Sequence, residues 1–253
     1  MTLDVKDLSV GFQTRSGLVS AVRRVSLSIT RGERVALVGE SGCGKSVMAL
    51  ALLGLLPRNA QVEGSASLGG SNLLDPKVAA SMRGREIAMC WSNAERYFNP
   101  VVPIGAQIGE AYALHHRRRA SAARERTLAL LREVGFEDPE RICGSYPFQL
   151  SGGMNQRAMI AMSLMNEPRL LLVDEPTRGL DDENRERVVR CLLAVSGASM
   201  LVITHDMDLV ERIAQRVYFM RAGEILDDGP VPGVLHAPGH RYSEQLLRAG
   251  LDA

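Results

Sequence analysis

The sequence is poor in aromatic residues and has no excess of charge of either sign. Only 4% of its 253 residues are aromatic, and 30 Lys and Arg residues nearly balance 29 Asp and Glu residues, for a net charge of +1. This balance gives no reason to expect a nucleic-acid-binding protein or a protein with an acidic surface. We therefore expect no nucleic-acid partner, and we interpret the basic run His115–Arg119 as a solvated helix end.

The sequence also lacks long apolar runs and paired cysteines. Its longest apolar run, Val47–Leu56, is interrupted by Gly54, whereas a membrane-spanning helix needs about 20 apolar residues. The first residues, Met1–Lys6, carry charges where a signal peptide would be apolar, so we expect no export. The four cysteines are Cys43, Cys90, Cys143 and Cys191. Their wide spacing argues against a zinc site or a disulfide framework and favours reduced thiols.

Apolar runs and helical patterns alternate along the chain. The runs Arg34–Val38, Leu170–Val173 and Met200–Ile203 are continuous, which is typical of parallel strands buried on both faces. Between them, Ile108–His116 and Ala120–Val134 have apolar residues at three- and four-residue spacing, which predicts helices. The pattern predicts an α/β core that is interrupted by a helical insertion.

A glycine-rich segment that fits the pattern GxxxxGK[ST] lies between a predicted strand and a predicted helix. Its glycines allow backbone N–H groups to converge on phosphate oxygens, and the helix N-terminus adds its positive dipole end. Lys45 would bring its charge to the β- and γ-phosphates, and the Ser46 hydroxyl would bind Mg²⁺. An ordinary glycine-rich turn would not need Lys and Ser at those positions. The predicted phosphate-binding residues are Gly39, Glu40, Ser41, Gly42, Cys43, Gly44, Lys45 and Ser46.

Polar residues follow two of the apolar runs. Asp174 and Glu175 come directly after Leu170–Val173, and ligands of open α/β sheets bind at the carboxyl ends of strands. Asp174 would hold Mg²⁺, directly or through water, and Glu175 would act as the general base for the attacking water. His205 ends the other run and could contact the γ-phosphate or that water, although a lone histidine is more often structural.

A second glycine-containing helix start is found at Leu150–Arg157, in which Ser151 precedes Gly152 and Gly153. Its hydroxyl and N–H groups also suit a phosphate. One nucleotide needs only one such cradle. The second would have a use if it served a nucleotide held by another subunit. On local chemistry alone, the preferred interpretation is a serine-capped helix without a special function.

Taken together, these segments resemble the nucleotide-binding subunits of ABC transporters. Gly39–Ser46 resembles the Walker A loop, Leu170–Glu175 the Walker B strand and Leu150–Gln156 the family signature. The resemblance implies an α/β P-loop NTPase (RecA-like) core with an N-terminal antiparallel β subdomain and a helical insertion. It also implies an ATPase that uses ATP and Mg²⁺, in a head-to-tail dimer with each ATP between one chain's Walker A loop and the other's signature.

Further site residues follow from the same resemblance. It places Asp181 in the D-loop, makes His205 the switch histidine, and puts Phe12 where an aromatic side chain would stack on adenine. The signature residues expected to face nucleotide are Ser151, Gly152, Gly153 and Gln156. The expected domains are a nucleotide-binding core with the β subdomain over 1–85 and 155–228, a helical subdomain over 86–154, and a tail over 229–253.

Several phrases resemble the dipeptide, oligopeptide and nickel importer branch of this family. They are Gly32–Ser41, Tyr146–Met154, Ala158–Pro168 and the tail His236–Ser243. The chain ends at Ala253, without the cysteine-containing extension of longer peptide importers. This favours a nickel or metallophore importer's D-type subunit, with small peptides as the other expected cargo.

The branch implies a membrane assembly. The expected partners are a second, non-identical ATPase subunit, two membrane-spanning permease subunits and an external solute-binding protein. The chain would lie at the cytoplasmic face of the inner membrane. The alternatives are a soluble ABC ATPase without membrane subunits and a slow-hydrolysing regulatory cassette in a heterodimer.

The sequence departs from the family pattern at a few positions. Ser92 stands where the Q-loop glutamine, whose side chain reaches Mg²⁺ and the attacking water, is expected. Because serine is shorter, we hypothesise slow hydrolysis or different coupling at this chain's Walker A site; tolerated drift, with a competent partner site, explains the change equally well. Arg178 and Gly179 are unusual before the D-loop, and Asn155 occupies a position where Arg or Ser is commoner.

Overall fold

The computed structural model describes residues 2–116 and 120–251, which form two compact units. The first unit contains Met1–Arg83 and Ser199–Ala253, and the second contains Gly84–Ala198. We interpret the basic run 115–119 as a solvated helix end, and its residues 117–119 lie outside the described residues.

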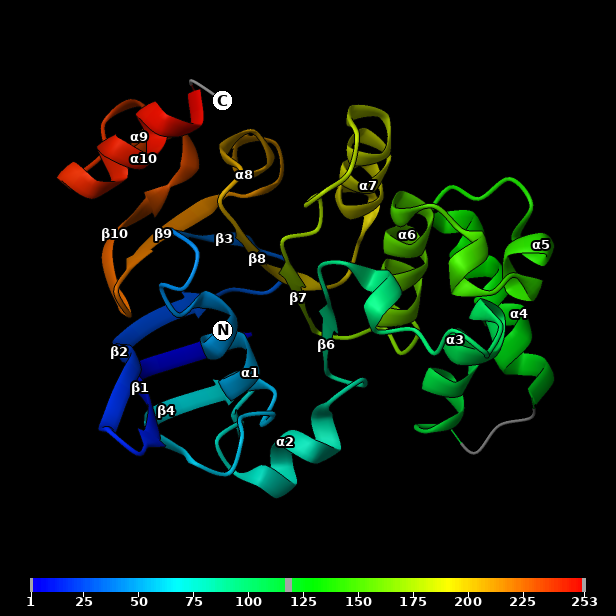
Figure 1. Ribbon diagram of the computed structural model, residues 1–253, viewed down its shortest axis with the longest axis horizontal. Coiled ribbons are helices and arrows are strands. Elements are labelled where there is room, and N and C mark those ends of the chain that lie inside the picture. The colour runs from blue at the N-terminus through cyan, green and yellow to red at the C-terminus, as the bar shows by residue number, and fades with distance from the viewer. Residues whose placement is uncertain (1, 117–119, 252–253) are drawn as a thin grey trace. The chain divides into compact units, whose positions relative to one another are not determined.

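An antiparallel sheet forms one layer of the first unit, and its strands lie side by side in Figure 1. In the order β2-β1-β4-β5, the strands are β2 (Gly17–Ile29), β1 (Leu3–Thr14), β4 (Ala60–Leu68) and β5 (Ser71–Asn72). Thr14 Oγ1 closes the tight turn between β1 and β2 by donating to the Gly17 carbonyl at 2.7 Å. Gly17 has a φ of 116°, a conformation that favours glycine.

A second group of strands in this unit has the order β10-β9-β3-β8. Strand β3 (Arg34–Val38) runs parallel to both β8 (Ser199–Thr204) and β9 (Arg216–Arg221), while β10 (Glu224–Pro230) returns antiparallel to β9. Every residue of β8 is buried, as expected for a continuous apolar run in a parallel sheet.

Helices pack against the strands of the first unit, and the last two join the C-terminal part of the chain to them. The helices of the first unit are α1 (Lys45–Leu52), α2 (Pro76–Met82), α8 (Met207–Ile213), α9 (Val231–His236) and α10 (Arg241–Leu251). Val210 of α8, Val234 of α9 and Leu247 of α10 share one apolar core with Val38 and Phe219. In Figure 1, α9 and α10 lie together beside β10.

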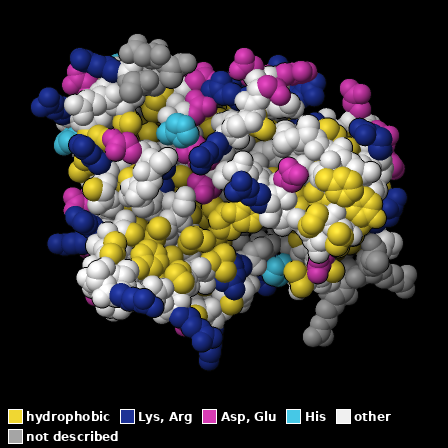
Figure 2. Space-filling model, viewed as in Figure 1, with side chains coloured by type: hydrophobic (Ala, Val, Ile, Leu, Met, Phe, Trp, Pro, Cys, Tyr) yellow, Lys and Arg dark blue, Asp and Glu magenta, His cyan; other side chains and the backbone are white. Residues whose placement is uncertain are grey.

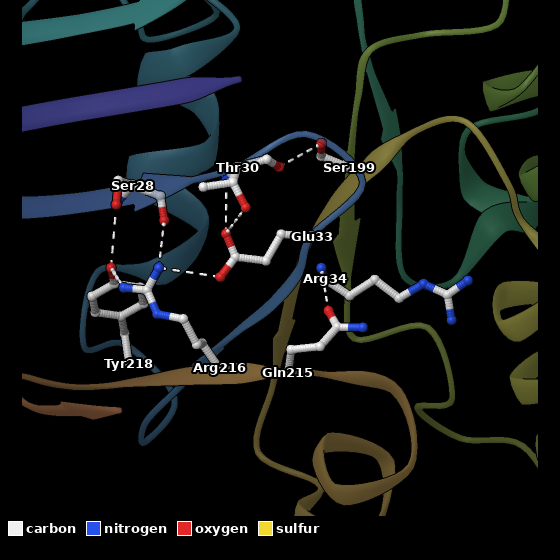
Figure 3. Close-up of polar contacts among 8 residues, drawn as sticks. All are labelled: Ser28, Thr30, Glu33, Arg34, Ser199, Gln215, Arg216 and Tyr218. Carbon is white, nitrogen blue, oxygen red and sulfur yellow. Dashed lines mark hydrogen bonds and ion pairs between the residues drawn. The ribbon is translucent and has the colours of Figure 1, made fainter. Parts of the chain in front are cut away.

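A polar network braces the start of β3 (Figure 3). The Glu33 carboxylate accepts hydrogen bonds from Thr30 N at 2.6 Å and from Arg216 Nη1 at 3.1 Å. Gln215 Oε1 accepts from Arg34 N at 2.6 Å, and Tyr218 Oη accepts from Ser28 N at 3.3 Å. These contacts fix the amino end of the strand whose carboxyl end leads into the glycine-rich segment.

The second unit combines two parallel strands with helices. The strands are β6 (Ile87–Cys90) and β7 (Leu170–Asp174). The helices are η1 (Ala94–Arg96), α3 (Ile104–Ala113), α4 (Ala120–Glu133), α5 (Pro139–Gly144), η2 (Pro147–Gln149), α6 (Gly152–Ser163) and α7 (Asp182–Ala194). Helix α3 begins four residues before the predicted Ile108, directly after Pro103, whose fixed φ suits a helix start.

Each unit exposes some large apolar side chains. They include Leu18, Val19 and Val62 in the first unit and Tyr97, Val101 and Phe148 in the second. Figure 2 shows hydrophobic side chains gathered in patches on one face, with Lys, Arg, Asp and Glu side chains around the patches. Within the described ranges, no helix is long and apolar enough to cross a membrane.

Candidate functional site

The glycine-rich segment of the first unit forms a strand–loop–helix turn with the features of an anion cradle. Strand β3 ends at Val38 and α1 begins at Lys45. Gly42 and Gly44 have φ values of 83° and 111°, which other residues rarely adopt. Gly44, the N-cap of α1, has no side chain that could accept a hydrogen bond from the N–H groups of the first helical turn. These groups and the helix dipole suit phosphate oxygens.

Lys45 lies inside this turn rather than in solvent. Its side chain is buried, and Nζ donates to the Gly39 carbonyl at 2.6 Å and to the Glu40 carbonyl at 2.9 Å. An ammonium group held among the loop carbonyls is placed to meet the charge of a phosphate bound by the loop. The residues present therefore fit a nucleotide phosphate group.

The loop is held from outside by β9, β10 and α10. Gly223 N, in the turn between β9 and β10, donates to the Cys43 carbonyl at 2.9 Å. A Cβ on Gly39 would lie 2.1 Å from the Met220 carbonyl oxygen, so only glycine fits against β9 here. Tyr242 Oη accepts from Glu40 N at 3.2 Å and donates to Met220 O at 3.3 Å. No local pattern in the sequence points to this tyrosine, apart from its place in a tail that resembles the importer branch.

His205 follows β8 at the same edge of the sheet as the glycine-rich loop. Val38 pairs with Thr204 in the parallel register, so Gly39 and His205 both come directly after paired residues. Thr204 Oγ1 accepts from Asp206 N at 3.0 Å, which fixes the turn, and the His205 side chain is exposed. Phe12 is half-buried in β1, opposite Val19 of β2 and Ala60 of β4.

Two acidic residues end β7 in the second unit. Cys90 of β6 pairs with Val173 of β7, so Ser92 and Asp174 both follow at the carboxyl edge of this strand pair. Glu175 has a φ of 44°, a left-handed conformation that is uncommon outside glycine. Burial raises the pKa of the Cys90 thiol to about 12, and the negative charge of Asp174 adds to this shift, against a hydrogen bond from Gln156.

Ser151 begins the signature helix α6 as its N-cap. Its Oγ accepts from Met154 N at 3.3 Å. The fully buried Asn155 amide donates to the carbonyls of Pro147 at 2.9 Å, Leu150 at 3.3 Å and Ser151 at 3.3 Å. The residue that departs from the family pattern thus holds together the turn that presents the signature.

Gln156 ties α6 to the segment after β6. Its Nε2 donates to the Trp91 carbonyl at 2.9 Å, and its side chain is 3% exposed. The structure therefore places this predicted nucleotide contact against the backbone next to Ser92. Ser92 itself is half-buried on a bend, beside a stack of the Trp91 and Tyr97 rings with centroids 4.9 Å apart.

The signature and the D-loop meet within the second unit. Asp181 is the N-cap of α7, and its carboxylate accepts from the Asn184 N and Nδ2 atoms, both at 2.8 Å. Both hydrogen bonds lower the pKa of Asp181, and the bond from the Asn184 backbone N–H has the larger effect. Helix α6 passes so close to Asn184 at Gly153 that a Cβ there would lie 2.4 Å from Asn184 Oδ1. Gly152 has ordinary space around it, with Leu180 Cδ2 at 3.5 Å.

Comparison with known proteins places these features in one family. The model of the ABC transporter family matches residues 22–178. The chain is 39% identical over 253 residues to the dipeptide transport ATP-binding protein DppD of Haemophilus influenzae, covering 98% of this chain and 77% of that protein. It is 42% identical over 254 residues to the peptidoglycan transport ATP-binding protein YejF of Agrobacterium fabrum, covering 98% of this chain and 46% of that protein.

A solved structure of similar fold is the dimeric ATP-binding cassette MJ0796 in a post-hydrolysis state, bound to ADP and Pi. It has a TM-score of 0.79 and 25% identity, and the match covers 90% of this chain and 98% of that chain. The predicted α/β P-loop NTPase fold is confirmed by this likeness. Since the family model spans more than half of the sequence, the chain belongs to the ABC transporter family as an ATP-binding domain with ATPase activity.

Proposed function

We propose that the chain is the ATPase subunit of an importer for small peptides. The observation that carries this proposal is the 39% identity to a dipeptide transport ATP-binding protein over 98% of the chain. A putative peptide import ATP-binding protein of Brucella ovis, 41% identical over 259 residues, supports the same cargo class. The prediction of nickel or metallophore uptake has no such support and serves as the competing outcome of the test below.

The proposed residue roles divide between the two units. In the first, Gly39–Ser46 binds the phosphates of ATP, Phe12 stacks on adenine, and His205 contacts the γ-phosphate or the attacking water. In the second, Glu175 takes the proton of the attacking water, because its carboxylate oxygens can accept a proton as a general base does. Ser46 in the first unit and Asp174 in the second are each proposed as a Mg²⁺ ligand, and the ion would neutralise charge on the phosphates.

The signature residues Ser151, Gly152 and Gly153, with Asp181, would serve a nucleotide that is bound mainly by another ATPase subunit. The buried Gln156, which was expected to join them, would instead hold the signature helix against the Trp91 carbonyl. The proposed assembly contains a second, non-identical ATPase subunit, two permease subunits and an external solute-binding protein, with this chain at the cytoplasmic face of the inner membrane. The proposed division of the chain is a core over 1–85 and 155–228, a helical subdomain over 86–154 and a tail over 229–253.

Uptake by the complete transporter tests the cargo. Proteoliposomes that contain both ATPase subunits and the permease subunits, supplied with the binding protein and MgATP, are assayed with a radiolabelled dipeptide and with radioactive nickel. We expect dipeptide uptake that Lys45→Ala abolishes and that Lys77→Ala, an exposed lysine in the same unit, leaves unchanged. Uptake of nickel alone would replace the peptide assignment, and uptake of neither solute would contradict an importer of this class.

The second functional candidate is an ATPase subunit whose own Walker A site hydrolyses ATP slowly, and the serine at position 92 favours it. A serine side chain cannot span the distance that a glutamine spans, so water would have to bridge the gap. Restoring glutamine with Ser92→Gln is expected to raise the hydrolysis rate of the complex. Unchanged hydrolysis and transport in this variant would remove the hypothesis and leave tolerated drift as the explanation.

A further inference from the structure

A tyrosine of the C-terminal helix reaches the phosphate-binding loop. Tyr242, in the first turn of α10, is 2% exposed, and the Arg221 guanidinium lies 4.9 Å from its ring centre. Its hydroxyl accepts from Glu40 N at 3.2 Å and donates to the Met220 carbonyl at 3.3 Å. One side chain thus joins the end of β9 to the second residue of the loop.

The helix that carries Tyr242 is anchored independently of the loop. The Asp227 carboxylate, on β10, accepts from Gly239 N at 3.0 Å, from His240 N at 3.1 Å and from Ser243 Oγ. At the other end of the same helix face, Leu247 belongs to the apolar core under β3 and β9. The position of the tyrosine hydroxyl is therefore set by the fold around it, before any ligand is bound.

The peptide group between Gly39 and Glu40 contacts both Tyr242 and Lys45. Its N–H, that of Glu40, donates to the tyrosine hydroxyl, and its carbonyl, that of Gly39, accepts from Lys45 Nζ at 2.6 Å. The next carbonyl, that of Glu40, also accepts from Lys45 Nζ, at 2.9 Å. The preceding Gly39 has no room for a side chain, because β9 packs directly against it. The hydroxyl, the Glu40 backbone and the lysine ammonium form a continuous chain of contacts.

We infer that Tyr242 is a positioning residue for ATP binding, which holds the Glu40 backbone so that the loop and Lys45 are arranged before the phosphates arrive. The inference rests on the proposed role of Gly39–Ser46 in binding ATP. A loop that is already ordered loses less conformational freedom on binding, so affinity falls when the ordering contact is removed. Without the hydroxyl, the Glu40 N–H loses its acceptor while the tyrosine ring can still fill its place.

The test is the substitution Tyr242→Phe, compared with Tyr218→Phe. Tyr218 is a matched control because it is 4% exposed, lies in the same unit, and its hydroxyl contacts Ser28 and Arg216 at the far end of β3 (Figure 3). Affinity is measured by titrating the full chain with N-methylanthraniloyl-ATP, and thermal unfolding is measured for each variant. We expect Tyr242→Phe to raise the Kd about tenfold, or about 1.4 kcal/mol. Tyr218→Phe should leave the Kd within about twofold of wild type.

A second variant keeps the test decisive if Tyr242→Phe folds poorly. Asp227→Asn weakens the anchor of α10 without touching the loop, and it should raise the Kd in the same direction. Equal Kd values for wild type, Tyr242→Phe and Asp227→Asn would overturn the inference, whatever happens to the unfolding temperature. The variant Lys45→Ala distinguishes failure of this inference from failure of the proposed function. Unchanged ATP affinity in that variant would show that the loop is not the ATP site.

Discussion

The substitution Gly153→Ala should damage the contact between the signature helix and the D-loop, whereas Gly152→Ala should not. An added Cβ at Gly153 would lie 2.4 Å from Asn184 Oδ1 and 2.6 Å from Asn184 Cβ. Asn184 cannot move away freely, because its N and Nδ2 atoms both donate to Asp181 at 2.8 Å. At Gly152 the nearest atom is Leu180 Cδ2 at 3.5 Å, an ordinary van der Waals distance.

The expected changes in the free energy of unfolding follow from these distances. Overpacking costs about 1–3 kcal/mol, and loss of the side-chain hydrogen bond between Asn184 and Asp181 costs about 0.5–1.5 kcal/mol. The replacement of glycine by alanine within a helix returns about 0.5–1 kcal/mol. We therefore expect Gly153→Ala to lower the free energy of unfolding by about 2 kcal/mol. For Gly152→Ala we expect a change within about 1 kcal/mol, on the stabilising side.

Equilibrium unfolding in urea measures both variants. The sequence has a single tryptophan, Trp91, which lies in the same unit as the two glycines, so its fluorescence reports on the relevant part of the chain. Gly153→Ala should shift the midpoint to lower urea without changing the slope. Unfolding free energies of the two variants that agree within about 0.5 kcal/mol would refute the reasoning from the Asn184 contact.

Three further predictions concern buried or half-buried polar groups. Asn155→Ala should lower the free energy of unfolding by about 1–3 kcal/mol, and Asn155→Asp by more, because a carboxylate would then face the Pro147 and Leu150 carbonyls; urea unfolding of the two variants gives the order. Burial would raise the pKa of Glu33, but hydrogen bonds from Thr30 and Arg216 outweigh it and lower that pKa from 4.5, so the carboxylate stabilises the fold above its unfolded pKa. The stability difference between wild type and Glu33→Gln should therefore be constant near neutral pH and be lost as the pH falls from 4.5 through the lower pKa of the folded state. A difference of unchanged size in acid would contradict the stabilising role of the Glu33 carboxylate. The Cys90 thiol, with its pKa raised to about 12 by burial, should react with N-ethylmaleimide at pH 8 only after unfolding, as mass spectrometry of the labelled peptide can show.

Local chemistry made the phosphate-binding loop predictable from the sequence. The strand before it, the positive φ values at Gly42 and Gly44 and the helix from Lys45 all follow from residue types that allow few other conformations. The turn between β9 and β10 carries a local signal of the same kind, because Gly223 adopts a φ of 89° there. The full lengths of β1 and β2 are harder to predict, because both strands continue across positions with exposed side chains that weaken the apolar pattern.

Contacts between distant residues were not predictable. Tyr242 and Glu40 are 202 positions apart, and no local pattern connects a tyrosine in a C-terminal helix to a loop near the start of the chain. Asn155 was identified only as a departure from a family pattern, whereas its role depends on three carbonyls that the fold brings together. The close approach of Gly153 and Asn184 likewise depends on how α6 and α7 pack.

The most direct test of the proposed catalytic role is ATP hydrolysis by the Glu175→Gln variant. Phosphate release and N-methylanthraniloyl-ATP binding are measured for the purified chain alone and with its candidate ATPase partner. Glu183→Gln, an exposed glutamate in α7, is the control. We predict that Glu175→Gln binds the nucleotide as wild type does but releases almost no phosphate, while Glu183→Gln is fully active. Hydrolysis by Glu175→Gln at the wild-type rate would contradict the assignment of Glu175 as the general base.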